Sequence, residues 1–442
     1  LMAPRPSPRR MSQATIALLR DNLTLVPFVA VGGLATVGFQ LLLSRSLEPT
    51  VYGETFAVLG VLSLLATPSL LIQTVIARST ARLSSRGQGV GLRTATRIAA
   101  RRLGIAATLL TIIIAALTPV LMRMFQLTSP WPLVVAATGA GLALMEPLFR
   151  GVTQGARVFV AHGAIVAMHG LGRLSVGSIA VLTGGGSTGA LLASPAAALA
   201  GIGTGVVAVR RLWRGVEPPN PGDRPKEPMS EHVRVGLIVA VMAALLHLDG
   251  LVMRAFHPPT VAADYAALAV LGRSVYWVGI TIGVVLLPYV VHAAIRGEDY
   301  VRAYLISMGL MALVGSGTAI TLLLRPEFAY SLVFHDGYTP NNQLLPAYVA
   351  ASAMLAIATM TANLHIGTSN LRVWIPLVVL LLGTIGALGA AHDSEEQVLT
   401  VILVADAVAM TYLVGEAALL ARRSSAGSPA TLSVIHGKQL QS

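Results

Sequence analysis

Twelve long apolar stretches, separated by short polar breaks, constrain the fold of this chain more than any other feature of the sequence. A helix needs about 20 predominantly apolar residues to cross the hydrocarbon core of a bilayer. Each stretch is close to that length or longer, so we predict an all-α polytopic membrane protein with twelve transmembrane helices. The predicted spans are residues 24 to 44, 52 to 77, 103 to 125, 131 to 149, 158 to 183, 187 to 208, 235 to 255, 262 to 291, 302 to 324, 344 to 366, 371 to 390 and 397 to 421.

The composition agrees with this interpretation. Of the 442 residues, 55% are hydrophobic and only 11% are charged, whereas roughly 25% of the residues in a soluble domain are charged. The chain has no cysteine, which excludes disulfides, thiolate metal sites and a cysteine nucleophile. The apolar run at 24 to 44 is longer than the core of a signal peptide, so we predict an uncleaved first span after a cytoplasmic segment, residues 1 to 23.

The basic residues predict the orientation of the chain. If the N-terminus is cytoplasmic, 25 of the 31 Lys and Arg residues lie on the cytoplasmic side and four on the outer side. This is the positive-inside pattern, so we predict a multi-pass protein of the bacterial cytoplasmic membrane with both termini, including the tail 422 to 442, in the cytoplasm. Orientation and the anionic headgroups of the inner leaflet also explain the basic loop 78 to 102. We therefore expect no nucleic-acid partner, despite the net charge of +12.

The longest polar break, residues 209 to 234, is rich in proline and charge and separates two sets of six spans. We predict an N-terminal lobe at 24 to 208, a cytoplasmic linker at 209 to 234 and a C-terminal lobe at 235 to 421. Because six is an even number, both lobes begin on the same side of the membrane. Repeated lobes would then be related by a pseudo-twofold axis along the membrane normal.

A short internal match supports such a repeat. Residues 44 to 60, SRSLEPTVYGETFAVLG, and residues 253 to 272, MRAFHPPTVAADYAALAVLG, each contain an arginine followed four residues later by a proline. The matching residues are Arg45, Pro49, Arg254 and Pro258. Both segments end in Val-Leu-Gly, after a three-residue insertion in the second. We predict that each segment joins the first and second spans of its lobe on the outer face.

Charged residues inside the predicted spans mark the candidate functional site. We single out Glu146, Arg173, Asp249 and Arg273, which all fall inside predicted spans. A charge at mid-bilayer costs about 2.5 to 3.5 kcal/mol on insertion scales, so such residues need a water-filled cavity or a partner. His162, His169 and Arg173 follow one another at i, i+7 and i+11, which places them on one face of the fifth span.

Three of these charges, Arg173, Asp249 and Arg273, lie in the outer half of the predicted bilayer, near the depth of Arg45 and Arg254. We therefore predict that the outer half of the interior is cationic. Structural alternatives stay open at each position.

An ion pair with Arg173 or Arg273 would account for Asp249, and a salt bridge to Arg150 near the cytoplasmic end would account for Glu146. Packing or hydrogen bonding would account for His162 and His169.

Three stretches carry motifs that are loose alone and fairly specific together. Residues 41 to 83 contain R-x-L-x-P-x-x-Y-G, residues 146 to 186 contain R-G-x-x-Q-G, and residues 246 to 290 contain H-x-D and D-Y-A-A-L-x-V-L-G-R. Together they resemble the polysaccharide (lipid-linked oligosaccharide) flippases of the multidrug/oligosaccharidyl-lipid/polysaccharide exporter superfamily. The resemblance covers about residues 20 to 290 well and the last four spans weakly.

This resemblance implies a V-shaped pair of six-helix bundles that moves a polyprenyl-diphosphate-linked saccharide across the membrane by alternating access. It implies that Arg45, Arg173, Arg254 and Arg273 bind the phosphates or sugars of the substrate, and that Asp249 is a counter-charge. We group Glu146 and His169 with Asp249 as counter-charge or ion-coupling candidates, and we expect no enzyme activity, cofactor or metal. The expected partners are the polyprenyl-linked glycan, membrane lipids, and glycosyltransferases or a polymerase of the same pathway. Lipid II flippases have basic residues in the first span that are absent here between Asn22 and Arg45, which favours a polysaccharide repeat unit.

Other functions stay open. A cation-coupled drug antiporter of the same superfamily would favour an anionic interior, and a scaffold of a glycan assembly complex would not transport at all. A major-facilitator transporter would need an acidic residue after the second span that this chain lacks. A membrane glycosyltransferase would have to use the short loop that contains Glu327, His335 and Asp336.

Overall fold

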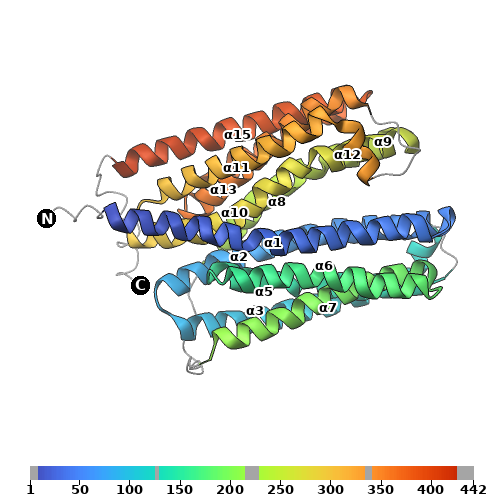
Figure 1. Cartoon of the computed structure of the whole chain (residues 1–442), viewed down its shortest axis with the longest axis horizontal. Helices are drawn as coiled ribbons and strands as arrows, with labels where there is room; N and C mark the ends of the chain where they lie inside the picture. Colours follow the sequence, from blue (N-terminus) through green and yellow to red (C-terminus); the bar gives the residue numbers. More distant parts are fainter. Residues whose placement is uncertain (1–7, 125–128, 215–227, 334–340, 426–442) are drawn as a thin grey trace.

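The computed structural model describes residues 8 to 124, 129 to 214, 228 to 333 and 341 to 425, and every regular element in these ranges is a helix (Figure 1). Eleven helical segments in the described ranges are long and apolar enough to cross a membrane. The 37-residue helix α2 has sufficient length as well. The predicted all-α polytopic membrane fold is therefore confirmed.

The N-terminal lobe contains the first seven helices. They are α1 (Pro8–Ser46), α2 (Pro49–Ser85), α3 (Gly89–Met124), α4 (Trp131–Ala143), α5 (Glu146–Gly155), α6 (Phe159–Leu182) and α7 (Gly186–Leu212). Within this lobe α6 packs against both α1 and α7, and α2 packs against α5.

The C-terminal lobe contains the remaining helices. They are α8 (Met229–Phe256), α9 (Pro259–Gly272), α10 (Ser274–Arg296), α11 (Tyr300–Leu324), α12 (Pro326–Val333), the short 3-10 helix η1 (Asn342–Leu344), α13 (Leu345–Gly367), the short 3-10 helix η2 (Leu371–Val373), α14 (Trp374–Ala390) and α15 (Glu395–Ser425). Helix α13 lies at the centre of this lobe, between α10 and α15.

Glycine permits close contact between α1 and α6. A Cβ added to Gly32 would lie 2.7 Å from the carbonyl oxygen of Val166. Small residues let the backbones of membrane helices approach in this way. The opposite surface of the lobe is apolar, since α3 exposes Leu109, Ile112 and Leu117, as expected of a helix that faces lipid.

Two predicted spans are broken into two helices. The fourth, predicted at 131 to 149, extends to Gly155 and breaks between α4 and α5, where Pro147 is among the first residues of α5. Proline disfavours helical geometry in the residue before it and lacks the N–H that would continue the preceding helix. The eighth span breaks at Arg273, between α9 and α10.

The two matching segments occupy equivalent places in the two lobes. Arg45 lies in the last turn of α1 and Arg254 in the last turn of α8. Pro49 is the first residue of α2, and Pro258 is the N-cap of α9. The second helices differ, however, because α2 continues to Ser85 whereas α9 ends at Gly272.

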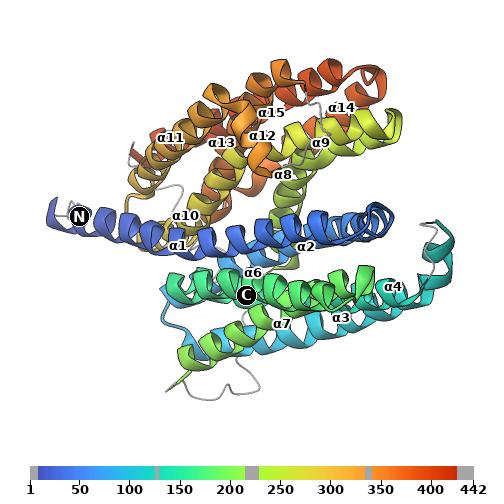
Figure 2. The same cartoon turned by 45° about the vertical axis from the view of Figure 1, so that its right-hand side comes forward.

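The two lobes meet at one end of the molecule and diverge toward the other (Figures 1 and 2). We call the end where they meet the basic end, since the turns there carry Arg86, Arg157 and Arg296. It is the end that the positive-inside pattern predicts to be cytoplasmic.

Two groups of contacts join the lobes at the basic end. On one side, Arg78 and Arg82 of α2 each donate to Glu231 Oε2 of α8 at 2.9 Å, and Arg78 Nε donates to the carbonyl of Ile366 at 3.0 Å. On the other side, Tyr289 of α10 donates its hydroxyl to Asp21 of α1 at 2.8 Å.

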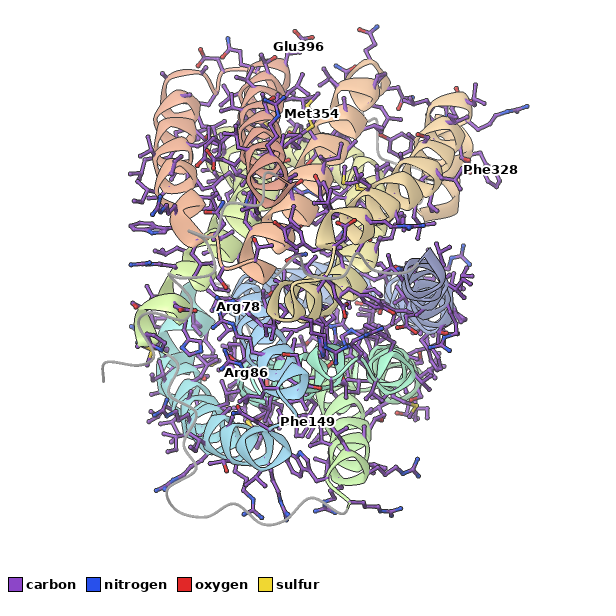
Figure 3. The ribbon with its side chains drawn as sticks, turned by 90° about the vertical axis from the view of Figure 1, so that its left-hand side faces the viewer. Arg78, Arg86, Phe149, Phe328, Met354 and Glu396 are labelled. Carbon is purple, nitrogen blue, oxygen red and sulfur yellow. The ribbon has the colours of Figure 1, made fainter. Side chains whose placement is uncertain are left out.

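Between these two groups, Gln154 of α5 donates to the carbonyl of Val284 of α10 at 3.0 Å. Arg78 is only 1% exposed and lies where the lobes meet (Figure 3). Polar contacts therefore hold the basic end closed in this conformation.

Candidate functional site

The helix breaks bring buried charged side chains together in each lobe. In the N-terminal lobe, Glu146 begins α5 and is 4% exposed. It forms an ion pair with Arg150 one turn later, and its Oε2 lies 2.7 Å from Nδ1 of His169 on α6. A carboxylate in the first turn of a helix is also favoured by the helix dipole. Helix α7 closes the site at Gly201, where an added Cβ would lie 2.7 Å from the carboxyl carbon of Glu146.

Arg173 completes what we call the N-lobe cluster, which consists of Glu146, Arg150, His169 and Arg173. It follows His169 by four residues on α6, so both side chains lie on the same face of that helix. The carboxylate of Glu146 acts electrostatically on Arg173, and Arg173 Nε is buried without a hydrogen-bond partner among the described residues. The N-lobe cluster thus combines two arginines with one carboxylate.

His162 has a different place. It is 3% exposed, and its Nδ1 lies 3.1 Å from the carbonyl oxygen of Arg150. This contact links the start of α6 to α5 and leaves His169, two turns further along, as the histidine that contacts Glu146.

In the C-terminal lobe, Asp249 of α8 is 2% exposed and accepts three hydrogen bonds. Arg273 Nη2 lies 2.5 Å from its Oδ1, and Tyr265 donates to Oδ2 at 3.3 Å. Tyr348 of α13 donates to the same Oδ2. Of the two ion pairs left open for Asp249, the structure contains the one with Arg273.

The break between α9 and α10 positions Arg273. The preceding residue, Gly272, is pressed against Tyr348, since an added Cβ would lie 2.4 Å from Cδ1 of that ring. The guanidinium carbon of Arg273 lies 5.9 Å from the centre of the same ring. Tyr348 therefore contacts both partners of the ion pair.

The sequence interpretation missed Asp406 of α15. This residue is 2% exposed, and its Oδ1 has no hydrogen-bond partner in the described part of the chain. It interacts electrostatically with Asp249 and Arg273. An aspartate inside the predicted span 397 to 421 was the signal that could have identified it. We call Asp249, Tyr265, Arg273, Tyr348 and Asp406 the C-lobe cluster.

The two remaining predicted arginines lie apart from both clusters. Arg45 and Arg254 are exposed at the ends of α1 and α8 and form no ion pair with any described residue. The structure therefore places the predicted binding residues in three settings: beside Glu146, against Asp249, and on the surface.

The two clusters differ in composition, and the cationic interior stays a prediction. The N-lobe cluster has an excess of arginine, whereas the C-lobe cluster sets two carboxylates against one arginine. In the loop considered for a glycosyltransferase, Glu327 lies exposed on α12, and His335 and Asp336 lie outside the described residues.

No protein-family model and no curated protein matches this sequence. Solved structures do match the fold. A multidrug resistance MATE family transporter of the MOP superfamily, in an outward-facing conformation, aligns with a TM-score of 0.71 and 13% identity over 94% of this chain and 97% of that chain. A MATE structure in the straight conformation aligns with a TM-score of 0.66 and 16% identity over 93% of this chain and 96% of that chain.

A third structure is a MOP superfamily transporter from Pyrococcus furiosus, for which the reverse polarity of the binding pocket suggests a different function. It aligns with a TM-score of 0.72 and 14% identity over 93% of this chain and 96% of that chain. At such identities the likeness shows the fold, and this chain has the two-lobed fold of the MATE transporters. The fold expected from the resemblance is confirmed, and the polysaccharide branch stays a prediction.

Proposed function

We propose that this protein translocates a polyprenyl-diphosphate-linked saccharide across the cytoplasmic membrane by alternating access. The observation that carries the proposal is the N-lobe cluster, where Arg150 pairs with the single carboxylate of Glu146 and Arg173 interacts with it electrostatically. The fold supports a transporter, since the solved structures that share it are transporters.

The chemistry of the substrate suits this cluster. A diphosphate carries negative charge and several strong acceptor oxygens, which guanidinium groups bind through charge-assisted and often bidentate hydrogen bonds. Glu146 already neutralises one positive charge. Arg173, whose Nε has no partner in the described residues, is the group we assign to the diphosphate.

The contacts at the basic end supply the conformational step. In the conformation described here Arg78, Glu231 and Gln154 hold the lobes together at that end. Alternating access requires these contacts to break so that the substrate enters from the cytoplasm, and to form again before it leaves on the outer side. Moving an anion outward against an inside-negative potential is favourable by about 2.3 kcal/mol per charge for each 100 mV.

This function places the protein between two groups of enzymes. Glycosyltransferases that build the saccharide on its lipid carrier must supply the substrate, and a polymerase or transferase on the outer face must consume it. Arg45 and Arg254, at the ends of α1 and α8 farthest from the basic end, would contact the saccharide as it leaves.

A cation-coupled drug antiporter is the second candidate. The observation that favours it is Asp406, a buried carboxylate with an oxygen that lacks a partner in the described residues, close to Asp249. Acidic groups of this kind inside a membrane are suited to binding a proton or another cation. A scaffold of a glycan assembly complex is the non-transporting alternative.

The deciding experiment reconstitutes the protein in liposomes that contain a fluorescent lipid-linked oligosaccharide and measures how much of it becomes accessible at the outer surface. We expect wild type to transport it, Arg173→Ala to lose most of the rate, and Arg173→Lys to retain part of it. Arg86→Ala, which removes an exposed arginine at the basic end, is the matched control and should transport normally.

The alternatives give different results in the same liposomes. Proton-driven efflux of a cationic drug that Asp406→Asn abolishes, with no oligosaccharide transport, would establish the antiporter. If the oligosaccharide were equally accessible in liposomes with wild type, with Arg173→Ala and without protein, the flippase function would be excluded. The non-transporting scaffold would then be the remaining candidate.

A further inference from the structure

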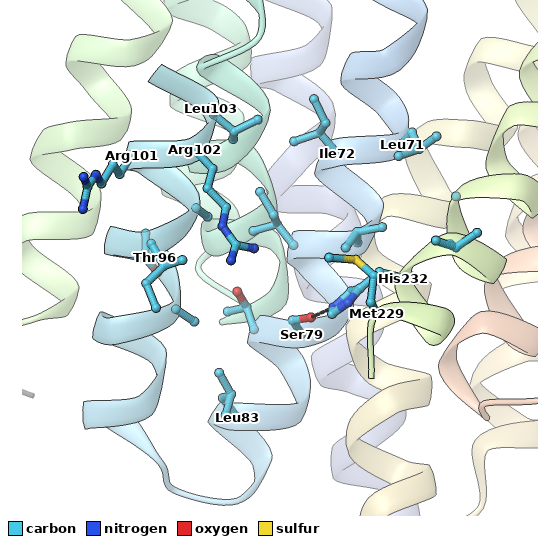
Figure 4. A pocket seen from close by; sticks show the side chains of 18 of the residues that line it. Leu71, Ile72, Ser79, Leu83, Thr96, Arg101, Arg102, Leu103, Met229 and His232 are labelled. Atoms are coloured by element: carbon cyan, nitrogen blue, oxygen red, sulfur yellow. Dashed lines mark hydrogen bonds between the residues drawn. The ribbon is translucent and has the colours of Figure 1, made fainter. Parts of the chain in front are cut away.

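A large groove opens between the two lobes at the basic end, away from both charged clusters. It has a volume of about 1150 Å³ and is lined by one side each of the segments 71 to 83 of α2, 95 to 105 of α3 and 229 to 240 of α8. We call it the α2–α3–α8 groove (Figure 4). Its volume exceeds the roughly 300 to 1,000 Å³ typical of small-molecule sites.

The deeper part of this groove is apolar. Leu71, Ile72 and Val75 come from α2, Ile105 from α3 and Leu237 from α8. All of them lie inside the predicted spans, at the level of the hydrocarbon chains. An apolar groove at this depth is complementary to acyl chains.

The shallower part carries polar and basic side chains. Arg102 immediately precedes the predicted span 103 to 125, and its guanidinium points into the space between α3 and α2 (Figure 4). Ser79 and His232, which lie 3.4 Å apart across the two lobes, lie just outside their own predicted spans. This is the depth of the phosphates of a bilayer.

Arg102 is available to a ligand. It is exposed, and it forms no ion pair or hydrogen bond with any residue that the structure describes. A phosphate at this depth would supply the missing negative charge and accept hydrogen bonds from the guanidinium.

The corresponding seam on the other side of the molecule is filled. There Leu18 and Leu25 of α1 pack against Val285 and Tyr289 of α10 in one buried cluster. Arg157 lies 3.7 Å above the ring of Tyr289. An empty seam is therefore not a general consequence of the two-lobed fold, since the described residues of α1 and α10 fill theirs.

We propose that the α2–α3–α8 groove binds one anionic phospholipid of the leaflet at the basic end, with its acyl chains along α2 and α8 and its phosphate on Arg102. A lipid in this position contacts both lobes. It stabilises the conformation in which the basic end is closed, since a ligand favours the state to which it binds more tightly. The site does not depend on which substrate the protein transports.

The experiment titrates the purified full-length protein in detergent with phosphatidylglycerol and with phosphatidylcholine of the same acyl chains. Native mass spectrometry counts the bound lipids, and the thermal unfolding temperature reports their effect on the fold. We expect phosphatidylglycerol to bind more tightly and to raise the unfolding temperature. Arg102→Ala should weaken its binding about tenfold, the effect of losing one charge-assisted contact.

Two pairs of variants localise the effect. Arg97→Ala removes an exposed arginine of α3 that does not line the groove and should bind phosphatidylglycerol as wild type does. Ala99→Trp places an indole in the groove and should abolish the stabilisation, whereas Ala106→Trp on the exposed face of α3 should not.

Arg102→Ala removes an exposed side chain that forms no hydrogen bond or ion pair with any described residue, so this variant should fold. It therefore still tests the proposal if Ala99→Trp fails to fold. Equal binding of the two phospholipids, or of wild type and Arg102→Ala, would overturn the proposal. Stabilisation by glycerol 3-phosphate alone would identify a site for soluble phosphates, and preferential binding of a polyprenyl phosphate would assign the groove to the lipid carrier. Either result would also overturn it.

Discussion

Arg78 Nη2 lies 2.9 Å from Glu231 Oε2, and this contact joins the two lobes through residues that are 153 positions apart in the sequence. Arg78 also donates to the carbonyl of Ile366, and its side chain is almost completely buried. The side chain of Glu231, by contrast, is 30% exposed and has Arg82 as a second partner. Loss of Arg78 therefore removes two contacts of α2 with the C-terminal lobe at the basic end.

We expect Arg78→Ala to shift the protein toward a conformation that is open at the basic end. The chain has no cysteine, so a single introduced cysteine reports accessibility without interference. Ala362→Cys is suitable, since Ala362 is 2% exposed and lines a small cavity between the lobes. Its reaction with a water-soluble maleimide should become at least about tenfold faster in Arg78→Ala, which corresponds to roughly 1.4 kcal/mol. Arg86→Ala should leave the rate unchanged, and an unchanged rate in Arg78→Ala would show that other contacts hold this end closed.

The close contact of α1 with α6 predicts opposite results for two neighbouring glycines. A Cβ at Gly32 would lie 2.7 Å from the carbonyl oxygen of Val166, whereas a Cβ at Gly33 would meet nothing within 4 Å. Gly32→Ala should therefore destabilise the protein by about 1 to 3 kcal/mol, the cost of overpacking. Gly33→Ala should be neutral or slightly stabilising. Thermal unfolding in detergent measures both, and equal unfolding temperatures would contradict the observed packing.

The ion pair between Asp249 and Arg273 predicts that the contribution of each residue to stability depends strongly on the presence of the other. Asp249→Asn or Arg273→Gln alone leaves a buried charge without its partner and should cost about 3 to 5 kcal/mol. The double variant should lose less than the sum of the two, since no unpaired charge remains from this contact. Chemical unfolding of the two single variants and the double variant gives the coupling energy. A coupling energy near zero would mean that Tyr265 and Tyr348, which also donate to Asp249, suffice to hold it.

Glu146→Gln tests the balance of charge in the N-lobe cluster. The substitution removes the carboxylate that neutralises Arg150 and acts on Arg173. We expect tighter binding of a polyprenyl diphosphate and lower stability, because two arginines then lack their counter-charge. Equilibrium binding of a fluorescent polyprenyl diphosphate in detergent measures the first effect and thermal unfolding the second. Weaker binding would show that Glu146 positions the arginines rather than opposing the ligand.

The sequence predicts the fold well because the membrane imposes a strong pattern on it. Every predicted span corresponds to one helix or to two consecutive helices, with ends that differ by up to 16 residues, as at the start of α1. The breaks at Leu144 and Arg273 were not predicted, since hydropathy does not register a local change of backbone direction. A proline such as Pro147 indicates a break, yet Pro27 and Pro68 lie within unbroken helices, so proline alone does not decide.

The sequence predicted most of the individual residues of the candidate site. It predicted few of the contacts between them. Charges inside the spans identified Glu146, Arg173, Asp249 and Arg273, and helical spacing placed His169 near Arg173. Tyr265 and Tyr348 could not be identified as ligands of Asp249, because tyrosine is unremarkable in a membrane helix and these residues are distant in sequence. The α2–α3–α8 groove could not be predicted from the sequence either, because its existence depends on how far apart α2 and α3 lie.

The different compositions of the two clusters mean that the two lobes are not interchangeable. The N-lobe cluster holds two guanidinium groups beside one carboxyl group, and the C-lobe cluster holds one guanidinium group beside two carboxyl groups. An anionic group that enters between the lobes therefore finds more guanidinium donors on the N-terminal side than on the C-terminal side.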